Sequence, residues 1–175
     1  MIIAASVYRV WDGRPMGFAP QIAMAIFAGA MLKDLKWAFL LPLISMFISD
    51  AIYQVLFING YTEIPGFYKG QIINYVMFGS LAVFGIMIRK INVAKVALAS
   101  IAAPTAYFLM SNFAVWIGGG GYAHPKTGGG LLLTYIDGLP FYRNSLLATL
   151  VFSAIFFGGY YLANKFIPSP RTQLV

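Results

Sequence analysis

Several polar side chains lie inside long apolar segments of this 175-residue sequence, where they could bind a ligand. Asp50 lies in the apolar segment that follows Lys36, and Asn112 lies near the end of another. Arg9 and Arg143 could hold an anionic group, because a guanidinium presents several N–H donors to an oxyanion. A charge within a bilayer costs several kcal/mol unless it is paired or solvated. Asp50 is therefore expected to face a cavity or an arginine.

These polar groups are expected at one depth, in the outer third of a membrane. At about 1.5 Å per helical residue, Asp50 lies about 20 Å beyond Trp37, which marks the inner end of its segment. Asn112 and Asn74 would supply directional hydrogen bonds, and Trp116 would stack on a ring. An excess of aromatic residues at this level is typical of a ligand pocket. The predicted ligand-binding residues are Arg9, Asp50, Asn74, Asn112, Trp116, His124 and Arg143.

Each of these residues also has a purely structural interpretation. Asp50 could form an ion pair that locks helices together, since buried charges are often simply paired. Asn112 could bond to a neighbouring helix, which is a common packing device in membranes. The aromatic residues could form a belt at the membrane interface. The sequence leaves these alternatives open.

Other motifs are rejected on spacing. The glycines of 118–121 and 128–130 do not form a phosphate-binding loop, because Lys126 follows Pro125 and no strand–helix unit surrounds it. His124 is the one histidine and there is no cysteine, so a metal site is not expected. We therefore expect a protein that is not an enzyme and needs no cofactor.

The composition requires a membrane environment. Hydrophobic residues make up 60% of the chain and charged residues 10%, with a mean hydropathy of +0.77, whereas soluble domains are about 25% charged. The absence of cysteine excludes disulfides and thiolate chemistry. Nucleic acid is not an expected partner, because the basic residues separate apolar segments and form no solvated patch.

Six apolar segments predict a single transmembrane domain, an all-α bundle of six helices. The first two segments are short for a span, and a long loop is expected over 118–144, where it would close over the site. The segments are 1–11, 19–33, 37–58, 70–88, 93–117 and 145–166.

Basic residues bias the predicted topology. The connections after the second and fourth segments and the C-terminal tail are short and basic, which places them in the cytoplasm by the positive-inside rule. Both termini would then be cytoplasmic, and the connections near 12–18, 59–69 and 118–144 would face outward. Inverted topology is the alternative.

Small residues crowd the second segment. Ala25 and Gly29 have the small-xxx-small spacing that allows close helix approach. Packing within the bundle explains this face, and so does docking of another membrane subunit through Ala23, Ala25 and Gly29.

The sequence also resembles a family of small bacterial membrane proteins of unknown function that carry a transport label. The blocks that carry the resemblance cover nearly the whole chain. They are Phe18-Ala19-Pro20 with AMAIFAGA, Pro42-Leu43 with Ser49-Asp50, 111–116, 122–127, 139–144 and FFGGYYLANK. The family is similar in plan to the substrate-binding S components of energy-coupling factor transporters.

The resemblance implies a function in uptake across the bacterial inner membrane. S components bind a vitamin or its precursor under their outer loops, and they associate with a transmembrane T component and two ATPases. The expected function is capture of a small vitamin-like or cofactor-like molecule. Membrane lipid is a second expected partner. The S-component docking motif lies on the first helix, where Ala4 and Ala5 match it poorly. The alternative function is a non-catalytic accessory subunit of a larger membrane complex.

Overall fold

The structure is a computed structural model of the chain that describes residues 2–88 and 90–166. Within these residues the protein is all-helical, as the composition and segment pattern predicted, and it contains no strand. The helices are α1 (Ile2–Val10), α2 (Gln21–Met31), α3 (Leu35–Ile58), α4 (Gln71–Ser80), α5 (Ala82–Ile86), α6 (Val93–Gly118) and α7 (Gly128–Phe166).

Three of these helices, α3, α6 and α7, are long and apolar enough to cross a membrane. Six such helices were expected. A helix of nine residues reaches about 14 Å, which is half of a hydrocarbon core of about 30 Å. Helices α1 and α2, with 9 and 11 residues, are too short to cross unaided. The fourth expected segment is divided into α4 and α5 at Leu81.

Side-chain caps explain where two of the long helices begin. The Asp34 carboxylate accepts a hydrogen bond from the Lys36 backbone N–H at the start of α3. The Asn92 side chain accepts from the Ala94 N–H at the start of α6 in the same way. Such caps satisfy backbone donors that have no partner within the helix.

The structure corrects the expectation of a long loop over 118–144. The connection covers 119–127, and α7 begins at Gly128, 17 residues before the predicted start. Thr127 caps this helix by accepting from the Gly130 N–H at 3.2 Å. Glycine and proline predicted a loop here, but both are tolerated inside apolar helices that neighbouring helices support. Helix α7 contains Pro140 and, with 39 residues, reaches about 58 Å.

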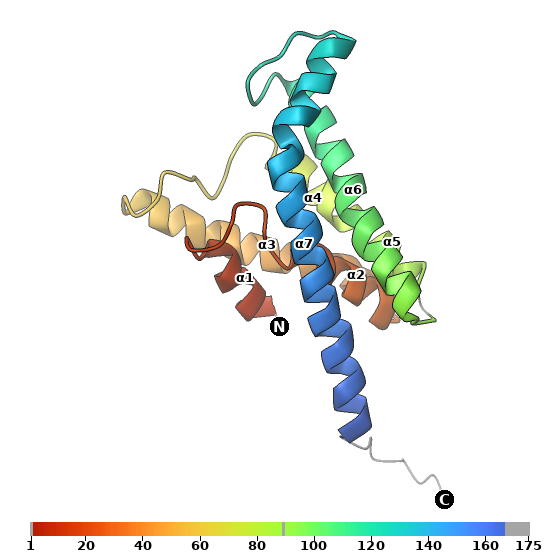
Figure 1. Cartoon of the computed structure of the whole chain (residues 1–175). Helices are drawn as coiled ribbons and strands as arrows, with labels where there is room; N and C mark the ends of the chain where they lie inside the picture. Colours follow the sequence, from red (N-terminus) through yellow and green to blue (C-terminus); the bar gives the residue numbers. More distant parts are fainter. Residues whose placement is uncertain (1, 89, 167–175) are drawn as a thin grey trace, which may run out of the picture.

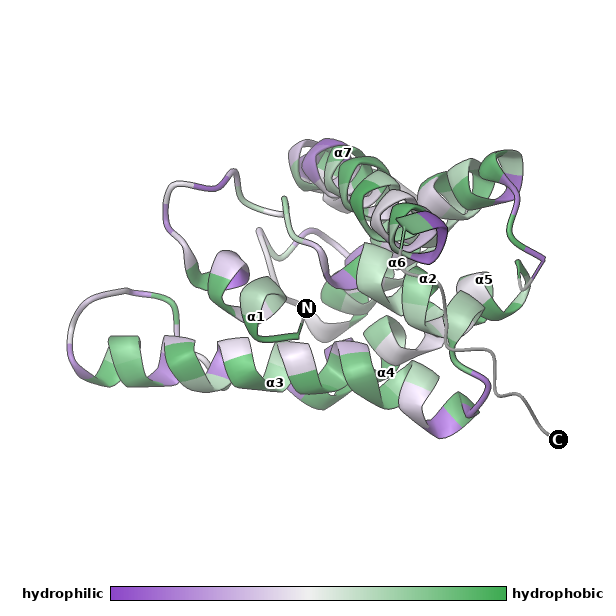
Figure 2. Cartoon of the chain, turned by 90° about the horizontal axis from the view of Figure 1, so that it is seen from below, coloured by the Kyte–Doolittle hydropathy of each residue, from purple (hydrophilic) through white to green (hydrophobic). Residues whose placement is uncertain are grey.

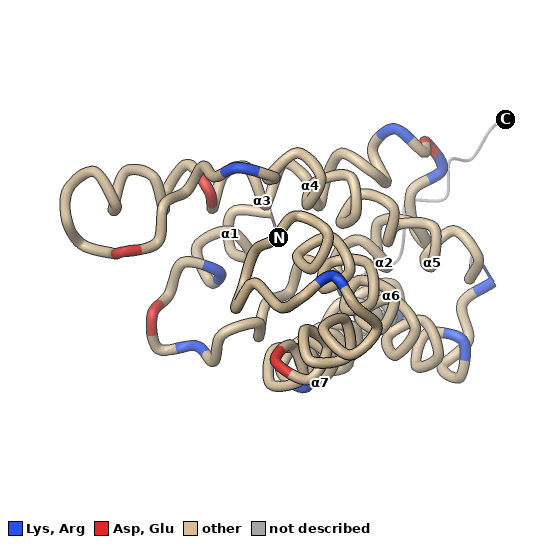
Figure 3. Tube along the Cα trace, turned by 90° about the horizontal axis from the view of Figure 1, so that it is seen from above, with Lys and Arg blue, Asp and Glu red and all other residues tan. Residues whose placement is uncertain are grey.

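The long helices do not stand in parallel. Figure 1 shows α6 and α7 side by side as a hairpin, with α3 lying across them and α1 beside α3. In Figure 2, seen from below, α7 is viewed nearly along its axis while α3 lies broadside. The same view shows hydrophobic residues on most helical turns. Figure 3 shows Lys, Arg, Asp and Glu mainly at helix ends and connections.

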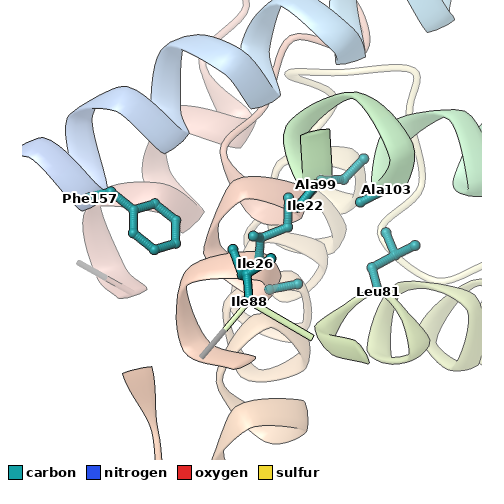
Figure 4. Packing of buried hydrophobic residues seen from close by; sticks show 8 residues of the cluster. Ile22, Ile26, Leu81, Ile88, Ala99, Ala103 and Phe157 are labelled. Carbon is teal, nitrogen blue, oxygen red and sulfur yellow. The ribbon is translucent and has the colours of Figure 1, made fainter. Parts of the chain in front are cut away.

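Helix α2 lies at the centre and packs against α3, α5, α6 and α7. Its Ile22 and Ile26 join Leu81, Ala103 and Phe157 in the main apolar cluster (Figure 4). This burial makes α2 the element around which the others are arranged.

The alanine-rich face of α2 is covered by the chain itself. Ala23 and Ala25 are fully buried, and Gly29 crosses Gly85 of α5 so closely that a Cβ on either glycine would overlap the backbone of the other helix. In this arrangement Ala23, Ala25 and Gly29 therefore have no exposed surface for docking another subunit. The small residues serve close packing of α2 on α5, the alternative that the sequence had left open.

Candidate ligand-binding site

Asp50 is the centre of a polar cluster that joins α1, α3 and α4. Its side chain is buried and forms an ion pair with Arg9. The other carboxylate oxygen accepts hydrogen bonds from Gln71 Nε2 at 2.8 Å and from the Tyr75 hydroxyl at 2.6 Å. Donors from two other helices, α1 and α4, surround the carboxylate, which satisfies the requirement for a buried charge. Asp50 therefore fixes the position of the Arg9 guanidinium.

The connection 59–70 is fastened beside this cluster. Gln54 Oε1 accepts hydrogen bonds from the N–H groups of Gly66 and Phe67, at 3.1 and 3.2 Å. A Cβ on Gly66 would overlap the backbone carbonyl oxygen of Asp50 and lie 2.5 Å from the backbone nitrogen of Gln54. The connection fits against α3 because residue 66 has no side chain.

The connection 11–20 brings a second arginine to the same place. Arg14 Nε donates to the Arg9 carbonyl oxygen at 2.6 Å, and its Nη2 donates to the Tyr53 hydroxyl at 3.2 Å. Asn144 of α7 holds the other side of the connection by donating to the Met16 carbonyl oxygen at 2.9 Å. Both arginines are thus held by groups from α1, α3 and the connection itself.

These elements surround a cavity of about 680 Å³, which we call the main cavity. Its walls come from the connection 11–20, α2, α4, α6 and α7. The polar groups on its wall include Arg9, Arg14, Gln21, Tyr68, Asn74, Ser111 and Asn112. The aromatic groups include Phe78, Tyr107, Phe108, Phe141 and Tyr142. An apolar wall with a few convergent polar groups is the usual form of a small-molecule site.

A second cavity of about 510 Å³ adjoins the main cavity. Both are lined by Arg9, Arg14, Met16 and Tyr68. The second cavity lies against the connections 11–20 and 59–70, whereas the main cavity lies deeper among the helices. The two arginines and Tyr68 therefore stand between the loops and the interior.

Asn74 organises two tyrosines on the wall of the main cavity. Its Nδ2 donates to the Tyr68 hydroxyl at 2.9 Å, and its Oδ1 accepts from the Tyr107 hydroxyl at 2.7 Å. Burial raises the pKa of Tyr68, which lies in the connection 59–70, above its usual value near 10. The Tyr68 hydroxyl therefore keeps its proton at neutral pH, and that proton is not used in the bond to Asn74.

Comparison with known families matches residues 1–170 to a family of unknown function, DUF6580. The chain belongs to the DUF6580 family. The expectation of an uncharacterised family is thereby confirmed. No curated protein and no solved structure matches the chain in the corresponding comparisons. A function for this DUF6580 protein is therefore inferred from the geometry and the chemistry of the cavity.

The structure brings three of the predicted ligand residues to the main cavity. Arg9, Asn74 and Asn112 all line it, from α1, α4 and α6. Asp50 lies behind Arg9 and lines the second cavity instead. The ion pair considered for Asp50 as an alternative is present.

The other three predicted residues do not line the main cavity. Trp116 donates from Nε1 to the Pro125 carbonyl oxygen at 3.0 Å, and so holds the connection 119–127. His124 pairs with Asp137 at 2.6 Å on the same hairpin tip. Arg143 is exposed on α7, whereas its neighbour Tyr142 lines the cavity. Because α7 is helical through this region, Arg143 lies about 100° around the helix from Tyr142 and outside the cavity wall.

Three cavity residues escaped the sequence analysis. Arg14 and Tyr68 lie in connections, and Gln21 is the first residue of α2. Gln21 carried a usable signal, since a carboxamide directly after Pro20 in an apolar segment needs a partner. Nothing in the sequence distinguished Arg14 from the other basic loop residues.

Metal binding has no support in the part of the chain that the structure describes. Within residues 2–88 and 90–166, no group of three or more His, Asp or Glu side chains could hold an ion. The polar chemistry of the cavity is provided by guanidinium, carboxamide and hydroxyl groups.

Proposed function

We propose that this chain captures a small vitamin-like or cofactor-like molecule for uptake, and that the molecule binds in the main cavity. The cavity itself carries the proposal. Its volume of about 680 Å³ lies within the range of about 300–1,000 Å³ that small-molecule sites occupy. Its wall combines aromatic side chains with two guanidinium groups and three carboxamides.

The second cavity supports a route of entry. We propose that the ligand first meets Arg14 and Tyr68 between the connections 11–20 and 59–70 and then passes into the main cavity. Both connections are non-helical, and loops at a site commonly move to admit a ligand. Gly66 and Gln54 hold the second of them in its observed position.

We further propose a multi-pass arrangement in the bacterial inner membrane with both termini in the cytoplasm. Basic connections support this orientation. In Figure 1 the connections 59–70 and 119–127 lie in the upper part of the molecule and the C-terminal end of α7 lies at the bottom. The proposed partners are a transmembrane T component and its ATPases, on the S-component plan, because the sequence has no nucleotide-binding motif of its own.

The test is direct identification of a retained molecule. The protein is purified in a neutral maltoside detergent, and small molecules released by denaturation are identified by mass spectrometry. Ser111→Trp would fill the main cavity from α6, whereas Leu109→Trp places the same ring at an exposed position two residues away, about 200° around the helix. We expect wild type and Leu109→Trp to retain one molecule and Ser111→Trp to lose at least about 90% of it.

Thermal unfolding of each variant shows whether it is folded. If folded wild-type protein retains nothing but lipid and detergent, the proposal fails. Retention by Ser111→Trp equal to that of wild type would also contradict it. Stable co-purification with a large membrane complex, without a ligand, would favour the accessory-subunit alternative.

A further inference from the structure

We propose that the ligand of the main cavity is an aromatic monocarboxylate that carries N–H or O–H donors away from its carboxylate. This inference rests on the proposed function and specifies the chemistry of its ligand. It is carried by three features of the cavity wall: unbalanced positive charge, two fixed hydrogen-bond acceptors without donors, and paired aromatic rings.

The positive charge comes from Arg9 and Arg14. Arg9 is balanced by Asp50, and its Nη1 makes the bonds to Asp50 and Ser49. Arg14 has no carboxylate partner within residues 2–88 and 90–166, and its bonds go to two carbonyl oxygens and a hydroxyl. Asp12 and Asp50 line the second cavity, but neither lines the main cavity. Around the main cavity, the two guanidiniums and the Asp50 carboxylate that pairs with Arg9 leave a charge of +1, which one carboxylate would neutralise. Asp12 offsets charge only on the side of the second cavity.

Tyr68 adds a neutral donor beside this charge. Its hydroxyl accepts from Asn74 and keeps its own proton free. A carboxylate can accept several hydrogen bonds at once, and those from charged donors are the strongest. Arg14 and Tyr68 both line the main and second cavities, so they can meet the carboxylate at the entrance.

The first unused acceptor belongs to Gln21. Its side chain is 2% exposed, and its Nε2 donates to the Ala5 carbonyl oxygen at 3.2 Å. That bond fixes the amide orientation, because reversing it would bring two oxygens together. Gln21 Oε1 is then a buried acceptor with no donor in the part of the chain described, and it belongs to a residue that lines the main cavity. Buried polar atoms normally have a partner, so a ligand N–H or O–H is expected here.

Asn112 offers a second acceptor, on a half-buried side chain of α6. Its Nδ2 donates to the Phe108 carbonyl oxygen at 2.8 Å, which fixes Oδ1 as the free end of the amide. The amide lies directly over Gly138 of α7, where any Cβ would lie 2.5 Å from Oδ1. Gly138 therefore leaves room for the Asn112 amide at the wall of the main cavity.

Aromatic rings line the space among these polar groups. Phe78 and Tyr107 have ring centroids 4.4 Å apart, and Phe108 and Tyr142 have centroids 4.7 Å apart. All four side chains line the main cavity, from α4, α6 and α7. Rings of this kind pack well on a flat aromatic body, so the carboxylate and the donors are expected on one ring system.

The test uses three probes of nearly equal size: 4-aminobenzoate, 4-aminobenzamide and benzoate. The second lacks the negative charge, and the third lacks the N–H donors. Binding to detergent-purified protein, emptied of retained ligand by washing, is measured by isothermal titration calorimetry. We expect 4-aminobenzoate to bind at least about tenfold more tightly than 4-aminobenzamide, the effect of a charged hydrogen bond. We expect benzoate to bind several-fold more weakly than 4-aminobenzoate.

Two variants assign the effects to residues. Arg14→Gln should weaken 4-aminobenzoate binding by about 10- to 100-fold and leave 4-aminobenzamide nearly unchanged. Arg143→Gln removes an exposed arginine outside the cavity and should change neither. Gln21→Met should reduce the preference for 4-aminobenzoate over benzoate. Thermal unfolding of each variant identifies any that do not fold.

The outcomes separate this inference from the proposed function. If the neutral amide binds as tightly as the carboxylate, or folded Arg14→Gln binds 4-aminobenzoate as wild type does, the ligand class is wrong while capture of a small molecule stands. If no probe binds, the molecule retained by the wild-type protein decides: an aromatic monocarboxylate with donors supports the inference, and any other molecule overturns it. If no molecule is retained and no probe binds, both proposals fail.

Discussion

Substitution of Gly66 by alanine should detach the connection 59–70 from α3. The new Cβ would overlap the Asp50 carbonyl oxygen and lie 2.5 Å from the Gln54 nitrogen. Both neighbours are backbone atoms within α3, so they cannot rotate aside as a flexible side chain could. The connection itself must move, and it forms part of the boundary of the second cavity.

The size of the effect follows from the bonds that this movement breaks. Gln54 Oε1 loses the N–H groups of Gly66 and Phe67, and Gln71 Nε2 loses the Gly66 carbonyl oxygen at 3.1 Å. At about 0.5–1.5 kcal/mol for each hydrogen bond, the connection is weakened by about 2–4 kcal/mol. A change of that size raises the fraction of molecules in which the connection 59–70 is open by about 30- to 1,000-fold.

Hydrogen exchange of residues 59–70, followed by mass spectrometry in detergent micelles, measures this opening. Gly60→Ala is the matched control in the same connection. Its φ of +74° would strain an alanine by about 1 kcal/mol, but no atom lies within 4 Å of the new Cβ. Exchange should therefore be much faster in Gly66→Ala than in Gly60→Ala. Equal exchange in the two variants would refute the close-approach argument.

Two further predictions concern packing and the hairpin tip. Gly85→Ala should lower the free energy of unfolding by about 1–3 kcal/mol, because its Cβ would overlap the Ile26 carbonyl oxygen of α2. Gly158→Ala, with no neighbour within 4 Å, should be neutral or up to about 1 kcal/mol stabilising, so equal thermal stability of the two variants would contradict this packing. Trp116→Phe should speed hydrogen exchange of 119–127, since it removes the donor to Pro125 and about 1 kcal/mol with it, yet leave 4-aminobenzoate binding unchanged. If Trp116→Phe weakened 4-aminobenzoate binding by more than about tenfold, Trp116 would have to be counted among the ligand-binding residues.

The sequence predicted part of the candidate site for a clear reason. A polar side chain in an apolar segment is costly, so Arg9, Asn74 and Asn112 could be singled out without coordinates. Trp116 and Arg143 were also predicted, but they do not line the main cavity. Their side chains are amphipathic and could be accommodated either at the site or on the surface, and the sequence does not say which sides of α6 and α7 face the cavity.

Composition by itself determined that this is an all-helical chain with membrane-like helices, because so much apolar surface has to be removed from water. Local caps at Asp34 and Asn92 determined where two long helices begin. The start of α7 at Gly128 depended on tertiary structure, since glycine and proline are tolerated in a helix only when neighbouring helices support it.

Tertiary structure alone decided which groups meet. The ion pair of Asp50 with Arg9 joins residues 41 positions apart, and the arrival of Arg14 beside them depends on how the connection 11–20 packs. The small residues of α2 had two possible partners in the sequence, another subunit or a neighbouring helix. Close approach of Gly29 to Gly85 decided between them, because a helix face that is already covered has no surface left for a second partner.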